Sequence, residues 1–536
     1  GFAAGDSISA TVNSTNITYQ VIADDLTVNG NGTGGEATEQ QARNHIASKL
    51  AAAIDADGDL NGVVTASANG DTITVSSVNN SDAVSLTTSI TSQPPAWNQI
   101  GLDIDGDIND GRSGRSVSLS DDGLTVAIGG NPQVQIHRWN GNTWVQQGDD
   151  IDVEVSDDFI NSVSLSSDGN TVAIGAKRND GNDPVNTGIS GDNVGHVRIF
   201  QWDGNGWIQR GDDIDGDSIG EQSGHSIALA SDGNSVVIAS PNYGPGNPGT
   251  YAGRVRAFTW DESNSSWVQR GSAIEGGFGE SYASHISSSS NGNILAFNYS
   301  GGVKAYEWNE ENSSWIQRGV DIPSSIGMQG NGISLSSDGN IIAIGDHTSY
   351  KHFDDGSFNR HQGHVQIFGW EDGSWTQLGS DLIGVEEFDN FGKHLSLSSD
   401  GRSIVVSGSG EDEVRYFTWN ENTSDWENGS QVIVGEVQHR SASSISRSSD
   451  GNILAIGSET NDGDDPSKVR VGHTRIFSIA ESSTGELTAS ESTTDTSTVV
   501  VTITGTNDSP DITFADDSGA VTEDASTSAD GVVTPQ

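Results

Sequence analysis

The 536-residue sequence contains no cysteine, and it has only 24 lysines and arginines against 75 aspartates and glutamates. The missing cysteines exclude disulfide bonds and thiolate metal sites. The formal charge of −51 disfavours nucleic acid and anionic membrane surfaces as partners, because clustered lysine and arginine bind both. No apolar run approaches the roughly 20 residues that a membrane-spanning helix needs. Divalent cations and a saline, extracellular medium suit such a chain better.

Short strands and polar turns dominate the sequence. Only 32% of the residues are hydrophobic, whereas glycine alone fills 68 positions. One unit recurs, consisting of an alternating strand, an Asp-Gly or Asn-Gly turn and an apolar strand, as in "SVSLSSDGNTVAIGA" at 162–176. These dipeptides are a strong hairpin signal, because glycine accepts the positive φ of a tight turn. The seven turn glycines are Gly123, Gly169, Gly233, Gly292, Gly339, Gly401 and Gly451.

A second hairpin follows each first one, as in "GHVRIFQWDGNGWIQRGDDID" from Gly195. Four strands in a unit of roughly 40–50 residues, repeated seven times, predict a mainly β chain folded as a seven-bladed propeller. Twelve of the 13 tryptophans form pairs in the second hairpins of six repeats. Tryptophan at one recurring place per blade indicates packing between blades more simply than sugar stacking.

The two ends of the repeat region complete one another. Trp97, in "AWNQIGLDIDGD", begins what resembles a fourth strand with no first three before it. The seventh repeat has Ile479 where the other repeats have tryptophan, and no fourth strand follows it. We therefore expect the strand near 97–103 to close the last blade, so that no lateral sheet edge stays unpaired.

The repeats resemble those of bacterial and algal propellers of the kelch and FG-GAP type. The resemblance covers about Pro95 to Ile479 and is carried by "SLSSDGNTVAIG", "GHVRIFQW" and "DDIDGD". It implies a propeller fold, which hosts binding, scaffolding and catalysis alike.

The flanking segments differ in composition from the repeats. Residues 1–93 predict a small α+β module, with Ile46, Leu50 and Ile54 at helical spacing. The propeller is expected over 94–480, and a Ser/Thr/Asp-rich tail with β-strand character over 481–536. In the tail, "TSTVVVTITGTNDSPDITF" resembles the junction between cadherin-like VCBS repeats of bacterial adhesins.

We expect the tail to pair with a sheet edge, either in the N-terminal module or in a neighbouring subunit. A head-to-tail pairing between subunits would produce a fibre, and hence a homopolymer or a row of adhesin domains. The candidates for strand donation are Val499, Val500, Val501 and Ile503.

Aspartates at alternating positions recur in the linkers between repeats and in the N-terminal module. Such spacing suits Ca²⁺, which takes about six to eight oxygen ligands. The EF-hand glycine and glutamate are missing, and the alternative is a solvated acidic connection. The candidate ligands are Asp55, Asp57, Asp59, Asp103, Asp105, Asp107, Asp110, Asp213, Asp215 and Asp217.

The long loop "DHTSYKHFDDGSFNRHQGH" combines histidine, aromatic and basic residues. Loops on a rigid scaffold are where binding usually resides, so this one is a candidate for a glycan or metal site. The alternative is a loop that only packs on its neighbour. His225 and His394 precede inner strands and are candidates for lining the central channel. The loop candidates are Tyr350, Lys351, His352, Phe353 and Arg360.

The function that these patterns favour is that of a non-enzymatic structural or adhesive protein of a bacterial surface, matrix or filament. A lectin-like propeller that binds glycans is the alternative. A polysaccharide-active enzyme is a third hypothesis, although no nucleophile elbow, HExxH motif or phosphate-binding loop stands in the sequence. Parity of the four strands places the long loops and the acidic linkers on one face of the ring.

Overall fold

The structure is a computed structural model with two compact units. One consists of residues 97–479, and the other combines residues 1–96 with residues 480–536. The residues described are 7–12, 15–20, 39–58, 60, 63–69, 72–77, 86–91, 97–153, 160–180, 193–244, 252–277, 280, 283–323, 332–347, 351–352, 358–359, 362–385, 388–408, 413–429, 433–434, 442–461, 469–479, 498–503 and 512–515.

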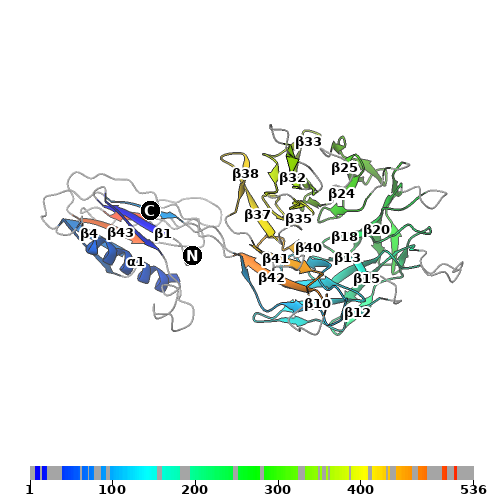
Figure 1. The fold of residues 1–536 in the computed structure, drawn as a ribbon, viewed down its shortest axis with the longest axis horizontal. Helices are drawn as coiled ribbons and strands as arrows, with labels where there is room; N and C mark the ends of the chain where they lie inside the picture. Colours follow the sequence, from blue (N-terminus) through cyan, green and yellow to red (C-terminus); the bar gives the residue numbers. More distant parts are fainter. Residues whose placement is uncertain are drawn as a thin grey trace. The chain divides into compact units, whose positions relative to one another are not determined.

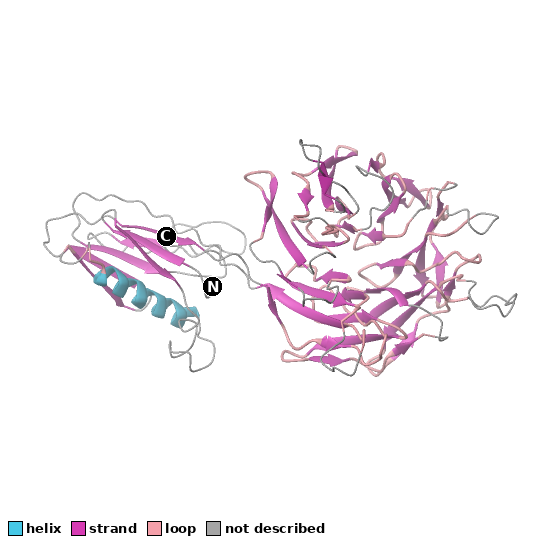
Figure 2. Ribbon diagram, viewed as in Figure 1, coloured by secondary structure: helices cyan, strands magenta, loops and turns pink. Residues whose placement is uncertain are grey.

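Residues 97–479 form a mainly β, seven-bladed propeller (Figures 1 and 2). Each blade is an antiparallel sheet of four strand positions, which we call A to D from the centre outward. Position D is split into two short strands that both pair with C. The fold class predicted from the repeats is confirmed.

Positions A to C each hold one strand per blade, in blade order around the ring. Position A holds β8 (Ser116–Leu119), β13 (Ile160–Leu165), β18 (Ser226–Leu229), β23 (Ile286–Ser288), β28 (Ile333–Leu335), β35 (His394–Leu397) and β40 (Ser444–Arg447). Position B holds β9 (Thr125–Gly129), β14 (Thr171–Ala176), β19 (Ser235–Ser240), β24 (Ile294–Tyr299), β29 (Ile341–Asp346), β36 (Ser403–Ser407) and β41 (Ile453–Ser458). Position C holds β10 (Gln133–Trp139), β15 (His196–Trp202), β20 (Arg254–Asp261), β25 (Gly302–Asn309), β32 (His364–Glu371), β37 (Glu413–Asn420) and β42 (His473–Ile479).

The split outer position follows the same order. Its first strands are β11 (Trp144–Gln146), β16 (Trp207–Gln209), β21 (Ser266–Gln269), β26 (Ser314–Gln317), β33 (Ser374–Gln377), β38 (Asp425–Asn428) and β6 (Trp97–Gln99). Its second strands are β12 (Ile151–Asp152), β17 (Ile214–Asp215), β22 (Ile274–Glu275), β27 (Ile322–Pro323), β34 (Leu382–Ile383), β39 (Ile433–Val434) and β7 (Ile104–Asp105). A further hairpin, β30 (Lys351–His352) with β31 (Phe358–Asn359), lies between B and C of the fifth blade.

Serines of the inner strands join each blade to the next. The Oγ of Ser116 accepts the backbone N–H of Val163 at 3.0 Å, and the Oγ of Ser118 accepts that of Leu165 at 2.9 Å. Equivalent bonds link other neighbouring blades, and Val117 bonds back to Ser444, so the series passes through the closure. Serine therefore alternates with apolar residues because one side of the strand reaches a neighbouring blade and the other enters the core.

The A–B turns form a closed ring of backbone hydrogen bonds. In each blade the residue before the Asp-Gly or Asn-Gly dipeptide donates its N–H to the carbonyl of its equivalent in the next blade, at 2.8–3.1 Å. Each bond contributes about 0.5–1.5 kcal/mol, so the ring matters as a set. The seven residues are Asp121, Ser167, Ser231, Ser290, Ser337, Ser399 and Ser449, and the last donates to the first.

The N-terminal end of the propeller closes its last blade. β6 and β7 pair with β42, with Ile479 opposite Trp97 and His473 opposite Asp105. The Trp97 side chain is 4% exposed and meets Tyr416 edge-to-face with ring centroids 5.6 Å apart. The predicted closure is confirmed.

The paired tryptophans join blades. The indole N–H of Trp207 donates to the Gln147 carbonyl of the preceding blade at 2.8 Å. Gly148 follows with φ of 80°, and a Cβ there would lie only 2.7 Å from Trp202, so the rings cover the preceding blade closely. The same indole bond is made by Trp144, Trp267, Trp315, Trp375 and Trp426.

The second unit combines both ends of the chain. Its sheets have the strand orders β2 (Thr15–Gln20), β1 (Ser7–Val12), β5 (Leu86–Thr91), and β3 (Val64–Asn69), β4 (Thr72–Ser77), β43 (Thr498–Ile503), β44 (Ile512–Ala515). The helix α1 (Glu39–Ala56) packs on β3 and buries Ile46, Leu50 and Ile54, as the spacing predicts. Among the described residues no helix is long and apolar enough to cross a membrane.

The tail strand pairs inside its own chain. β43 lies between β4 and β44, and its residues Val499, Val500 and Val501 stand opposite Val75, Thr74 and Ile73 of β4. Ile503 stands opposite Ile512 of β44. Of the two pairings that the sequence left open, the structure has the one with the N-terminal module. Donation of this strand to a neighbouring subunit, and with it the homopolymer, stays a prediction that is without support from this pairing.

We expect the intact chain to be a monomer of 56.0 kDa in solution, because the tail strand is already paired. Light scattering in millimolar Ca²⁺ and again after chelation measures this mass directly. Deleting 496–536 is expected to lower the melting temperature of the N-terminal unit and to leave the chain monomeric. Assemblies that disappear on this deletion would contradict the pairing within one chain.

Candidate functional site

One face of the propeller has the same structure in every blade, and the other differs from blade to blade. The A–B and C–D turns lie on one face, which we call the turn face, and the B–C loops and D–A linkers lie on the other, which we call the loop face. The turn face repeats one closed hydrogen-bond ring through all seven blades. The predicted parity of loops and linkers is confirmed, and the loop face is where the blades differ.

Two of the predicted calcium ligands form hydrogen bonds across the break between the two outer strands of their blades. Asp103 accepts a hydrogen bond from Gln99 at 2.6 Å, and Asp213 accepts one from Gln209 at 2.7 Å. Asp150, Asp321 and Asp381 do the same at 2.6–2.7 Å, each with a glutamine four residues earlier. These aspartates therefore have a structural role that recurs with the blade.

The histidines of the third strands face the same aspartates. His196 Nδ1 lies 3.7 Å from Asp213, and His473 Nδ1 lies 3.4 Å from Asp103. Both imidazoles are buried, and a histidine recurs at the start of the third strand in three blades, which indicates a structural role. With Asp215, His196 and Asp213 bring three ligand atoms within 4.8 Å of one another. A nitrogen ligand suits transition metals better than Ca²⁺.

The other predicted ligands do not join this group in the described part of the chain. Asp107 accepts a hydrogen bond from Gln133, and Asp110 pairs with Arg470 at 2.7 Å. Asp105 stands opposite His473 in the closing strand pair. In the N-terminal module, Asp55 and Asp57 accept backbone N–H groups, and Asp59 lies outside the described residues.

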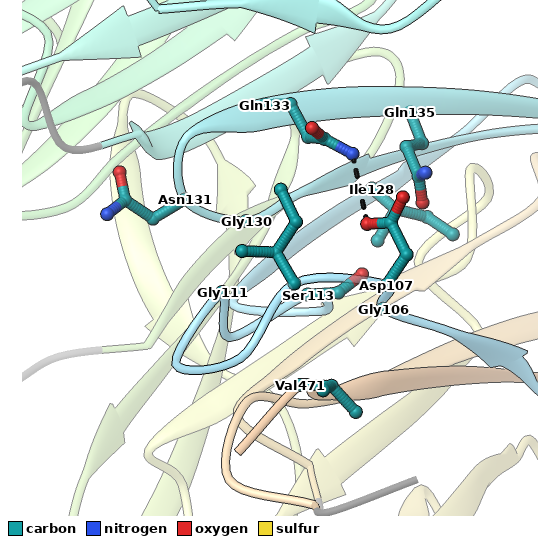
Figure 3. A pocket seen from close by; sticks show the side chains of 11 residues that line it. Gly106, Asp107, Gly111, Ser113, Ile128, Gly130, Asn131, Gln133, Gln135 and Val471 are labelled. Carbon is teal, nitrogen blue, oxygen red and sulfur yellow. Dashed lines mark hydrogen bonds between the residues drawn. The ribbon is translucent and has the colours of Figure 1, made fainter. Parts of the chain in front are cut away.

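A small pocket lies beside the linker of the first blade (Figure 3). Asp107 and Gln133 border it, and Asp107 is its only carboxylate. A volume of about 10 Å³ suffices for one water molecule and not for a sugar.

Buried ion pairs also lie in the linkers of the loop face. Glu221 is 0% exposed and lies 2.6 Å from Arg254, which also contacts Asp217 at 2.6 Å. Burial alone would lower the pKa of Arg254, but the two carboxylates outweigh it and raise the pKa above its usual value. Asp389 pairs with Arg415 at 3.1 Å in the same way. The pattern of alternating aspartates includes neither Glu221 nor Asp389, so the sequence prediction missed both.

The candidate loop of the fifth blade is only partly described. Lys351 and His352 form the strand β30, which pairs with β31. Their side chains, and the residues Tyr350, Phe353 and Arg360, lie outside the described part of the structure. The loop remains a prediction.

Basic and imidazole side chains gather at the loop-face end of the inner and second strands. We call six of them the mouth cluster, and all six are half-buried. His285 and His394 take the position that Ser116 has in the first blade, beside the neighbouring inner strand. Lys177 Nζ lies 3.4 Å from His225 Nδ1. The mouth cluster consists of Arg115, Lys177, His225, His285, Lys393 and His394.

The mouth cluster keeps its imidazoles neutral. Burial, with Lys177 and other nearby positive groups, lowers the pKa of His225 to about 3. Burial and the neighbouring cations likewise lower the pKa of His285 to about 4 and that of His394 to about 3. Burial, followed by Arg115 and Arg178, lowers the pKa of Lys177 to about 8.

We expect these three imidazoles to titrate far below pH 6.5 in the folded chain, and near it in urea. Between the unfolded value and about pH 4 the unfolded chain binds more protons, so their contribution to the free energy of unfolding falls as pH falls. NMR titration of labelled histidine, assigned with His→Gln variants, measures the three pKa values. Titration near pH 6.5 in the folded protein would contradict the packing of the mouth.

No protein family model matches the sequence, and no curated protein matches it. Among solved structures, one from Bacteroides uniformis named as a 6-phosphogluconolactonase is similar to 60% of this chain and 86% of its own, with 14% identity and a TM-score of 0.43. A match of that identity and score carries no argument about what this chain binds or does.

Proposed function

We propose that the chain is a non-enzymatic binding and adhesion module of an extracellular bacterial surface or matrix protein. The observation that carries this proposal is the contrast between the two faces. The turn face repeats one hydrogen-bond ring in seven blades, whereas the loop face changes from blade to blade. Binding residues usually lie on variable loops that a rigid scaffold positions.

The surface location and the adhesive role rest on the sequence. The kelch and FG-GAP resemblance of the repeats and the VCBS resemblance of the tail favour a place among adhesin domains. The charge of −51 suits a saline medium. Because the tail strand pairs within the chain, we assign the contacts with partners to the loop face of the propeller.

Glycans are the second candidate partners. The mouth cluster and the β30–β31 hairpin both belong to the loop face, and the sequence around the hairpin combines the basic and aromatic residue types that suit sugars. A lectin-like propeller is therefore the form of adhesion that these residues favour. Polysaccharide turnover stays the third hypothesis.

Calcium remains part of the proposal. We expect millimolar Ca²⁺ to raise the melting temperature with a saturating dependence, because a bound ion stabilises the folded state by mass action. Differential scanning calorimetry with Ca²⁺, and with Mg²⁺ as the control, measures the effect. An identical melting temperature in Ca²⁺ and in chelator would remove calcium from the proposal.

A glycan array probed with the intact chain tests the function. Binding without release of reducing ends from soluble polysaccharide is the expected result. Release of product would favour the enzymatic hypothesis instead. A chain that retains no glycan and no surface polymer, while folded by circular dichroism, would overturn the adhesive proposal.

A further inference from the structure

The mouth cluster concentrates positive charge in a strongly acidic protein. The whole chain has 75 acidic residues against 24 basic ones. Arg115, Lys177 and Lys393 come from three different blades, and the exposed Arg178 adjoins them. Glu459 brings a carboxylate to this end of the ring, 3.6 Å from Arg115. The buried Asp346 ends the strand before His347.

The cluster is built from several blades rather than from one. His285 of the fourth blade is affected electrostatically by Lys177 of the second, His347 of the fifth and Lys393 of the sixth. His225 of the third blade is affected by Arg115 of the first. The inner strands of neighbouring blades are in contact around the ring. Groups from six blades therefore lie at the same end of the ring of inner strands, the loop-face mouth.

The arrangement is unsuited to a metal ion. Within the described residues, the imidazoles of the mouth cluster do not bring three ligand atoms within 4.8 Å of one another. The lysines and the arginine would also repel a cation. Mutual repulsion among these groups is instead relieved by a negative charge placed between them.

We propose that the loop-face mouth of the propeller channel binds an anionic group, a carboxylate, sulfate or phosphate. This proposal rests on the proposed function for the identity of the ligand, which we take to be an acidic glycan bound at the loop face. Lys177, Lys393 and Arg115 supply the charge, since ammonium and guanidinium groups form strong hydrogen bonds to oxyanions. The imidazoles supply neutral N–H donors.

Calorimetric titration of the intact chain with sodium sulfate, sodium phosphate and sodium glucuronate tests this site. Sodium chloride at matched ionic strength is the control. The double variant Lys177→Gln/Lys393→Gln is expected to bind at least about tenfold more weakly, because it loses the ammonium groups that would form charge-assisted hydrogen bonds to the anion. The matched control is Lys49→Gln/Lys304→Gln, which removes the same charge elsewhere and is expected to bind as the unchanged chain does.

A second readout needs no variant. The bound anion is expected to raise the pKa values of His225, His285 and His394 in the NMR titration. Absence of heat and of any pKa change with all three anions would overturn the proposal, as would equal affinity of the two double variants.

The outcomes separate this site from the adhesive function. Binding of neutral glycans alone would keep the proposed function and remove the anion site. Binding of free sulfate or phosphate without any glycan would keep the anion site and remove the glycan as its source.

Discussion

Replacing Glu221 by glutamine is expected to lower the free energy of unfolding of the propeller by about 3–5 kcal/mol. Glu221 is fully buried and contacts Arg254 at 2.6 Å and 2.8 Å, and Arg256 lies 4.0 Å away. Its second oxygen accepts the N–H groups of Asp217 and Ser218. Glutamine keeps the size of the side chain, so the loss measures the buried charge and not a cavity.

The same substitution at an exposed ion pair is the control. Glu310 is 79% exposed and lies 3.4 Å from Arg270. Pairs of this kind contribute about 0–1 kcal/mol, so Glu310→Gln should be nearly neutral. Urea unfolding followed by tryptophan fluorescence compares the two variants. Equal midpoints would show that the linker of the third blade is not fixed by this ion pair.

Replacing Trp97 by alanine is expected to lower the free energy of unfolding by about 3–5 kcal/mol as well. Trp97 is 4% exposed, packs against Tyr416 and starts the strand that closes the last blade. Its loss empties part of a core that the two distant ends of the propeller sequence share, with Ile479 opposite it in the strand pair.

Leu102→Ala is the control in the same closing segment. Leu102 is 86% exposed, so its truncation should change stability by no more than about 0.5 kcal/mol. Thermal unfolding of the two variants gives the comparison. If the two variants have the same melting temperature, the closing strand does not stabilise the propeller.

The ring could be predicted because its parts are local and repeated. An Asp-Gly turn specifies a hairpin within a few residues, and seven copies then specify the blades. Even the closure left a local sign, since Trp97 and Ile479 complement each other. The pairing of β43 with β4 had no such sign, because several sheet edges were open to the tail.

The candidate metal residues were harder to interpret because one pattern serves two purposes. Asp103 and Asp213 resembled ligands, yet each accepts a bond from a glutamine four residues earlier. That glutamine is visible in "WNQIGLD" and "WIQRGDD" and would have indicated the structural role.

The mouth cluster could not be predicted from local sequence. Its residues are mostly separated by tens of positions and meet only when the blades close into a ring. His225 and His394 stood out in the sequence, but Lys177 and Lys393 were ordinary lysines until the strand ends placed them together. Alignment of the strand starts and ends across all seven repeats is the signal that could have found them.

Hydrogen–deuterium exchange of the intact chain with a saturating sulfated polysaccharide tests the central claim, that the loop face binds. Protection is expected at the loop-face strand ends, in 115–117, 177–178, 225–227, 285–286 and 393–395. Protection confined to the A–B turns of the turn face, confined to the N-terminal unit, or absent everywhere would contradict it.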